Sequence, residues 1–97
     1  PVDWPMDAAA SPSHAHFLDT HCHVDLYPDP AALLRQIEQQ RIYTVAVTNT
    51  PSVFSRLCDM VGTGRYVRPA LGLHPELAVQ RHRELPQFAT LLPRTRY

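Results

Sequence analysis

Residues 17–25, FLDTHCHVD, form the stretch around which the rest of the chain is organised. Its apolar start leads into His21 and His23, which one residue separates. If residues 17–23 form a strand, both imidazoles lie on one face, because side chains alternate along a strand. The flanking acidic residues share that parity: Asp19 and Asp25. Two imidazoles and a carboxylate at the end of a buried strand are half of a divalent-metal site.

The composition is that of a small protein without an extreme charge. The 97 residues suffice for one small domain or for part of a larger one. The formal net charge is zero, although residues 1–60 carry three arginines and seven acidic residues, whereas residues 61–97 carry six arginines and two acidic residues. The basic end could contact phosphate, but zero net charge argues against a dedicated nucleic-acid binder.

The cysteines and the apolar runs favour a cytoplasmic protein. Cys22 and Cys58 are too few for a disulfide framework and are expected to be small buried residues in a reducing compartment. The longest apolar run, around Tyr43 to Val47, is too short to span a membrane, and the start of the chain lacks the pattern of a signal peptide.

The chain is predicted to alternate strands and helices after an irregular or disordered leader. The leader covers residues 1–16, which are rich in Pro, Ala and Ser. Strands are predicted over 17–23, 42–48 and 66–73, and helices over 30–40, from a cap at Thr50 or Ser52 to Val61, and over 84–92. The middle strand is apolar or β-branched throughout, which suits burial on both faces. Such alternation predicts an α/β fold of about three βα units with a parallel sheet.

Local signals support these boundaries. Asp29 followed by Pro30 is a typical helix start. The first helix presents an apolar face that is expected to include Leu33, Ile37 and Gln40. Glycines after Val61 end the second helix, and residues 95–97 resemble the entry to a fourth strand.

Polar residues gather where each predicted strand ends, and functional groups in parallel α/β folds lie at those ends. His21 and His23 are the metal candidates, with paired core or surface histidines as the alternative. His74 could contact a phosphate or a metal-bound water, or it could hold its loop through a backbone hydrogen bond. Asn49 is expected to form a turn and Cys22 to face the core. The leader histidines, His14 and His16, are expected to be solvated.

The segments DTHCH at residues 19–23 and ALGLHPE at residues 70–76 together resemble the TatD family of metal-dependent hydrolases, and the stretch HCHVDLYPDP most resembles its QatD branch. The resemblance covers residues 17–97. It implies the N-terminal part of a TIM (β/α)8 barrel, a deoxyribonuclease activity with two divalent metal ions (Mg, Mn or Zn), and a role in antiviral defence beside partner proteins. His21 and His23 would be metal ligands, and His74 would lie near the metals or the scissile phosphate.

The chain departs from that family in its length. A (β/α)8 barrel takes roughly 250 residues, so the ligands expected from strand 4 onward are missing, and the 97 residues are expected to be inactive alone. Two alternatives stay open. One is a truncated binding or assembly module whose open sheet edges a partner protein covers. The other is a phosphoesterase of the polymerase-and-histidinol-phosphatase type, which shares the H-x-H motif.

Overall fold

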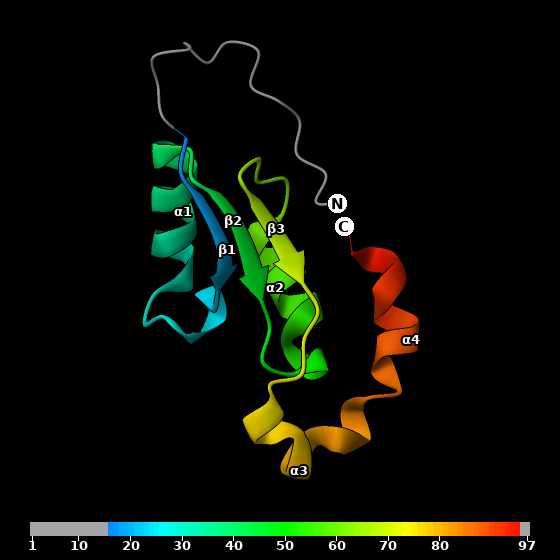
Figure 1. Ribbon diagram of the computed structural model, residues 1–97. Coiled ribbons are helices and arrows are strands. Elements are labelled where there is room, and N and C mark those ends of the chain that lie inside the picture. The colour runs from blue at the N-terminus through cyan, green and yellow to red at the C-terminus, as the bar shows by residue number, and fades with distance from the viewer. Residues whose placement is uncertain (1–15, 96–97) are drawn as a thin grey trace.

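The computed structural model describes residues 16–95, which form an α/β unit around one parallel sheet. The strands β1 (Leu18–Cys22), β2 (Tyr43–Val47) and β3 (Val67–Ala70) are hydrogen-bonded in the order β1-β2-β3. The helix α1 (Pro30–Gln40) joins β1 to β2, and α2 (Phe54–Val61) joins β2 to β3. Figure 1 shows both helices on the same side of the sheet. The predicted α/β class and the parallel pairing are therefore confirmed.

The first helix begins where the sequence predicts. The Oδ1 atom of Asp29 accepts a hydrogen bond from the N–H of Ala32 at 2.9 Å, and Pro30 is the first helical residue. The helix ends at Arg41, whose φ of 56° is left-handed. Ile37 is buried as expected, but Gln40 is exposed, so the apolar face is narrower than the sequence suggested.

The second helix is preceded by a short 3₁₀ turn, η2 (Pro51–Val53). Neither predicted cap is formed, because the hydroxyl of Thr50 lies 3.1 Å from that of Ser52 and makes no bond to a backbone N–H. Phe54 and Leu57 are fully buried on the inner face of α2, which stabilises the fold by about 1.5–3 kcal/mol each. The helix ends at Gly62, whose combination of a φ of 55° with a ψ of −125° is readily adopted only without a side chain.

The core lies between the sheet and these two helices. It contains the following buried residues: Val24, Leu34, Ile37, Ala46, Leu57, Tyr66 and Val67. In β2, Thr44 and Ala46 are buried, whereas the alternate residues Tyr43, Val45 and Val47 are only half-buried. The prediction that this strand is buried on both faces is therefore wrong for the described residues, because helices cover one face only.

The first strand was expected to be buried, and this expectation is also wrong. β1 is an edge strand of the three-stranded sheet, and its residues are exposed apart from Cys22. The pairing register slips between Asp19 and Cys22, which pair with Thr44 and Ala46. Simple alternation of side chains therefore does not hold through the middle of β1.

The chain after β3 differs most from the prediction. β3 ends at Ala70, three residues early. The helix predicted over 84–92 is a series of short elements, here called the C-terminal arm (residues 75–94): η3 (Pro75–Leu77), α3 (Ala78–Arg81), η4 (His82–Glu84), α4 (Gln87–Leu91) and η5 (Leu92–Arg94). Pro86 stands at the N-cap of α4, and a proline inside a helix would remove a hydrogen bond and clash with the preceding turn. Figure 1 shows the arm passing below the sheet and then rising beside β3.

Two sequence-based predictions fall largely outside the described residues. The irregular leader over residues 1–16 does so except for His16, and the fourth strand over residues 95–97 does so except for Thr95, which has an extended backbone. Among residues 16–95, no helix combines the length and the apolar character that crossing a bilayer requires.

Candidate functional site

His21 and His23 approach each other closely at the carboxyl end of β1. Their Nε2 atoms are 3.2 Å apart, and the two rings meet edge to face with an interplanar angle of 84°. Two nitrogen ligands about 2.1 Å from one ion lie about 3.0 Å apart at a right angle and about 3.4 Å apart at a tetrahedral angle. The observed separation falls between these values, and it also suits a hydrogen bond between the two rings.

The backbone of β2 fixes which nitrogen of His23 faces His21. The Nδ1 atom of His23 lies 2.8 Å from the carbonyl oxygen of Val47. Because a carbonyl only accepts, Nδ1 carries the proton, and the Nε2 atom of the neutral ring presents its lone pair. A backbone carbonyl in this position is the usual orienting partner of a metal-ligating histidine.

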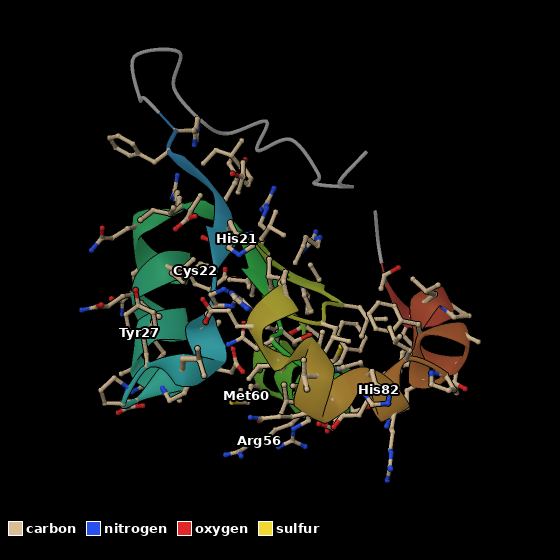
Figure 2. The ribbon with its side chains drawn as sticks, turned by 60° about the horizontal axis from the view of Figure 1, so that its bottom comes forward. His21, Cys22, Tyr27, Arg56, Met60 and His82 are labelled. Atoms are coloured by element: carbon tan, nitrogen blue, oxygen red, sulfur yellow. The ribbon has the colours of Figure 1, made fainter. Side chains whose placement is uncertain are left out.

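His21 is anchored more loosely. Its side chain is exposed, and its backbone N–H donates to the Oδ1 atom of Asp19 at 3.1 Å. Figure 2 shows His21 on β1 and Tyr27 beside α1, with His82 away from both on the C-terminal arm. A cavity of about 370 Å³ opens beside both histidines, and Asp19 and Tyr27 line it as well.

His74 lies at the same end of the sheet with the opposite arrangement of its nitrogens. Its Nδ1 atom accepts a hydrogen bond from the N–H of Glu76 at 3.1 Å, so the Nε2 atom of the neutral ring is a donor. The ring centroid is 6.4 Å from that of His23. His74 therefore holds its loop, as one of the two sequence interpretations had it, and still has an N–H that suits an anionic oxygen better than a metal ion.

A glycine brings the His74 loop against the end of β2. A Cβ atom at Gly72 would lie 2.5 Å from the carbonyl oxygen of Thr48, so only glycine permits this approach. The N–H of Gly72 donates to the hydroxyl of Thr48 at 3.1 Å, and the N–H of His74 donates to the carbonyl of Asn49 at 2.8 Å. These bonds draw residues 71–73 out of the ladder, which explains why β3 is short.

Two buried oxygen atoms near this end of the sheet lack a hydrogen-bond partner among the described residues: Oδ1 of Asp25 and Oδ1 of Asn49. Asp25 lies in the 3₁₀ turn η1 (Val24–Leu26), beyond the end of β1. Unpaired buried oxygens are costly unless a proton, a water molecule or a cation satisfies them. Both are oxygen atoms that can accept a hydrogen bond or coordinate a cation, so they are compatible with a cation nearby.

Cys22 takes no part in the cluster. It packs against the core, and burial, followed by the negative charges of Asp19 and Asp25, raises the pKa of its thiol. The thiol therefore stays protonated at neutral pH and is a poor nucleophile, as expected from its place in the strand. Glu76 is exposed in the first turn of η3, where an acidic residue suits the helix dipole.

The residues present fit two ligand positions of one divalent ion, and not a two-metal centre. Within residues 16–95, no three or more His, Cys, Asp or Glu side chains gather closely enough to hold a metal. His14 lies outside the described residues, and the ring of His16 sits 5.7 Å from that of Tyr43, beside residues at the start of β2. Any further ligands of an ion held by His21 and His23 have to be water molecules, substrate atoms or groups outside residues 16–95.

Sequence reasoning found the histidines but missed the groups that orient them. The carbonyls of Val47 and Asn49 position His23 and His74, and a backbone carbonyl has no signature in the sequence. The glycine before His74 was the one signal that could have indicated the close approach. No protein-family model matches the chain, and no curated protein matches it.

Proposed function

We propose that His21 and His23 bind one divalent metal ion, and that the chain forms the first βα units of a metal-dependent hydrolase of the TatD type that cleaves phosphodiester bonds in DNA. The 3.2 Å approach of the two Nε2 atoms, with His23 fixed by the Val47 carbonyl, is the observation that carries this proposal. An ion bound there supplies Lewis-acid stabilisation of a phosphate and activation of a water molecule.

The other groups at this end of the sheet fit the same task. The Nε2–H of His74 is oriented by the bond that its Nδ1 atom accepts, and it donates to a phosphate oxygen in our proposal. Residues 61–97 also carry six arginines against two acidic residues, and this excess of positive charge favours the approach of a polyanionic substrate through long-range attraction, although not all of these arginines lie at this end of the sheet.

The order of the strands supports a partial (β/α)8 barrel. Each strand is added beside the preceding one, and α1 and α2 lie on one side of the sheet, as in a barrel wall. A doubly wound sheet would carry helices on both faces. Because the described residues provide only two ligands, we propose that the 97-residue chain does not cleave DNA without further ligands.

Metal binding by the purified chain tests the proposal. We expect Co²⁺ to give an absorption band from imidazole coordination, and His21→Ala and His23→Ala each to weaken binding by at least about tenfold, since each removes one of two ligands. His82→Ala is the matched control, because His82 is exposed on the C-terminal arm. Equal Co²⁺ binding by all of these variants would refute the site.

Hydrolysis assays separate the possible activities. We expect no cleavage of single-stranded DNA by the chain alone. Metal-dependent cleavage of DNA that His21→Ala abolishes would contradict the proposal that the chain is inactive alone. The same result would support the proposal that His21 binds a metal ion for DNA hydrolysis. Turnover of a phosphate monoester without cleavage of DNA would instead favour the phosphoesterase of the polymerase-and-histidinol-phosphatase type.

A non-catalytic assembly module is the second candidate function. Its support is the exposed edge of the sheet at β1, where Phe17 and Leu18 are 70% and 59% exposed. Unpaired backbone groups beside apolar side chains are a template for another chain. In this case the partner would be another protein of the same defence system.

A further inference from the structure

Tyr27 lines the same cavity of about 370 Å³ as His21 and His23, and the binding of a metal ion by the histidines gives it no role. Tyr27 is 50% exposed, and Leu26 beside it is 63% exposed. Pro28 continues this apolar part of the lining. Large apolar side chains that stay exposed in a concavity are typical of a binding site. The cavity thus combines a pair of imidazoles with an apolar, partly aromatic wall.

The backbone of Tyr27 is held in place on both sides. Its N–H donates to the carbonyl of Val24 at 3.2 Å, and Val24 is fully buried in the core. Tyr27 is extended, with a φ of −72° and a ψ of 152°, which is the conformation that a following proline favours. Asp29 then caps α1. Because this backbone is fixed and a tyrosine side chain has few torsions, little freedom is lost when its ring contacts a ligand.

The charge of the cavity lining favours a neutral group beside Tyr27. Asp19 contributes a carboxylate to the lining, and its Oδ1 atom accepts a hydrogen bond from the N–H of His21 at 3.1 Å. A carboxylate repels the oxygens of a phosphate, but it can accept a hydrogen bond from the exocyclic amino group of a base such as cytosine. An uncharged base therefore suits this wall, whereas a phosphate suits a metal ion at the histidines.

An exposed aromatic ring in a cavity offers a flat face to a planar ligand. Every nucleobase has such a face, and its stacking on an aromatic side chain tolerates any base sequence. Base and phosphate belong to the same strand of DNA, so a base that stacks on Tyr27 keeps a neighbouring phosphate close to His21 and His23.

We propose that Tyr27 stacks against one nucleobase of the DNA strand whose phosphate the metal ion holds, with Leu26 and Pro28 as the walls beside that base. This inference rests on the proposed function and adds a base-binding subsite to it. Tyr27 is then a substrate-binding residue that positions the phosphate through the base, and it takes no part in proton transfer or metal binding.

Fluorescence anisotropy with the full chain, Co²⁺ and a pair of single-stranded oligonucleotides tests the subsite. The strands have equal length and equal phosphate number, but one carries bases and the other is abasic. We expect Tyr27→Ala to weaken binding of the base-bearing strand by at least about fivefold, the contribution of one stacked base, and to leave binding of the abasic strand unchanged. Tyr27→Phe keeps the ring and should bind both strands like the wild type.

Phe17→Ala is the matched control for the loss of an exposed aromatic side chain. Phe17 is 70% exposed and lies just before β1, outside the residues that line the cavity, so this variant should bind both strands like the wild type. Urea unfolding of Tyr27→Ala, a change at a half-exposed position, verifies that lost binding does not reflect lost folding.

Three results would overturn the subsite: equal binding of the two strands by the wild type, a preference for bases that Tyr27→Ala leaves unchanged, or equal losses in Tyr27→Ala and Tyr27→Phe. The last result would assign the effect to the hydroxyl group and not to stacking. The Co²⁺ absorption band of the wild type reports the metal site separately. A wild type that binds Co²⁺ without preferring bases contradicts the subsite alone, whereas a Tyr27-dependent preference without Co²⁺ binding contradicts the metal site alone.

Discussion

His74 engages two parts of the chain at once. Its Nδ1 atom caps the 3₁₀ turn η3 through the N–H of Glu76, and its own N–H donates to the carbonyl of Asn49. The ring therefore couples the position of the loop to the direction of its Nε2–H. In a metal-ligating histidine, one ring nitrogen usually donates to a backbone or carboxylate oxygen, and the other nitrogen offers its lone pair. In His74 the arrangement is the opposite, because Nδ1 accepts from the backbone and the Nε2 atom of the neutral ring carries the proton.

Substitutions at this residue separate capping from chemistry. We expect His74→Ala to lower the free energy of unfolding by about 1 kcal/mol, the usual loss for an N-cap. His74→Asn should lower it by less than half as much, because the Oδ1 atom of asparagine can accept from the same N–H. Urea denaturation measures both values. Equal losses in the two variants would show that the cap does not stabilise the loop.

The three candidate site residues share one property. His21, His23 and His74 lie at or after the carboxyl ends of β1 and β3, as the chain direction of a βαβ pattern predicts, although the register slip in β1 means that simple side-chain alternation does not explain their positions. Their tautomers could not be predicted, because these depend on the carbonyl of Val47 and the N–H of Glu76, which folding brings to the rings. The order of strands and helices in the sequence therefore indicates where these histidines lie, whereas contacts formed on folding determine which ring nitrogen of His23 and of His74 carries the proton.

At the scale of elements, the helices with strong local signals were predicted most accurately. α1 has a capping aspartate followed by proline, and its bounds match the prediction of residues 30–40. Apart from the cap that His74 provides to η3, the elements of the C-terminal arm have no side-chain caps, the arm lacks a long apolar face, and prolines interrupt it at positions 75, 86 and 93. Its course depends on tertiary contacts instead, and these join residues more than 30 positions apart.

Glu84 makes one of these contacts. Its Oε2 atom accepts a hydrogen bond from the N–H of Ser52 at 3.2 Å, and its Oε1 atom pairs with Arg81 at 3.1 Å. Burial acts to raise the pKa of this carboxyl, but the hydrogen bonds from Ser52 and the charge of Arg81 outweigh it and lower the pKa below the usual glutamate value. The carboxylate thus fastens the C-terminal arm to η2, the turn that precedes α2.

The attachment of the arm should depend on pH. A lowered pKa in the folded state means that the contact stabilises the fold above the ordinary glutamate range and is lost as the pH falls through the folded value. We expect the amide resonance of Ser52 to titrate with a midpoint below that of a free glutamate, as NMR can measure. Glu84→Gln should abolish this titration, and Glu76→Gln, a change at an exposed position, should not. A Ser52 titration that survives Glu84→Gln would show that another group is responsible.

At the scale of the whole molecule, the two edges of the sheet are protected differently. At β3, the guanidinium of Arg68 covers the carbonyl oxygens of Arg65 and Val67, and Pro69 offers no N–H. Both features leave fewer free backbone groups for a further strand at this edge than β1 offers. β1 carries no proline, and its apolar start is exposed beside the edge. The two edges are thus unequal, and β1 is the one that suits another chain.

Self-association through β1 is the consequence that we expect. Phe17 and Leu18 lie at the free edge, so burying them against a second chain would stabilise an assembly by about 1.5–3 kcal/mol per side chain. Sedimentation velocity over a wide range of protein concentrations should show association, which Leu18→Lys lowers by placing a charge at the edge. Val79→Lys is the control, because Val79 is 86% exposed but lies on α3, away from the edge. A monodisperse monomer at every concentration, or equal effects of the two lysines, would contradict pairing at β1 and weaken the assembly module as a candidate function.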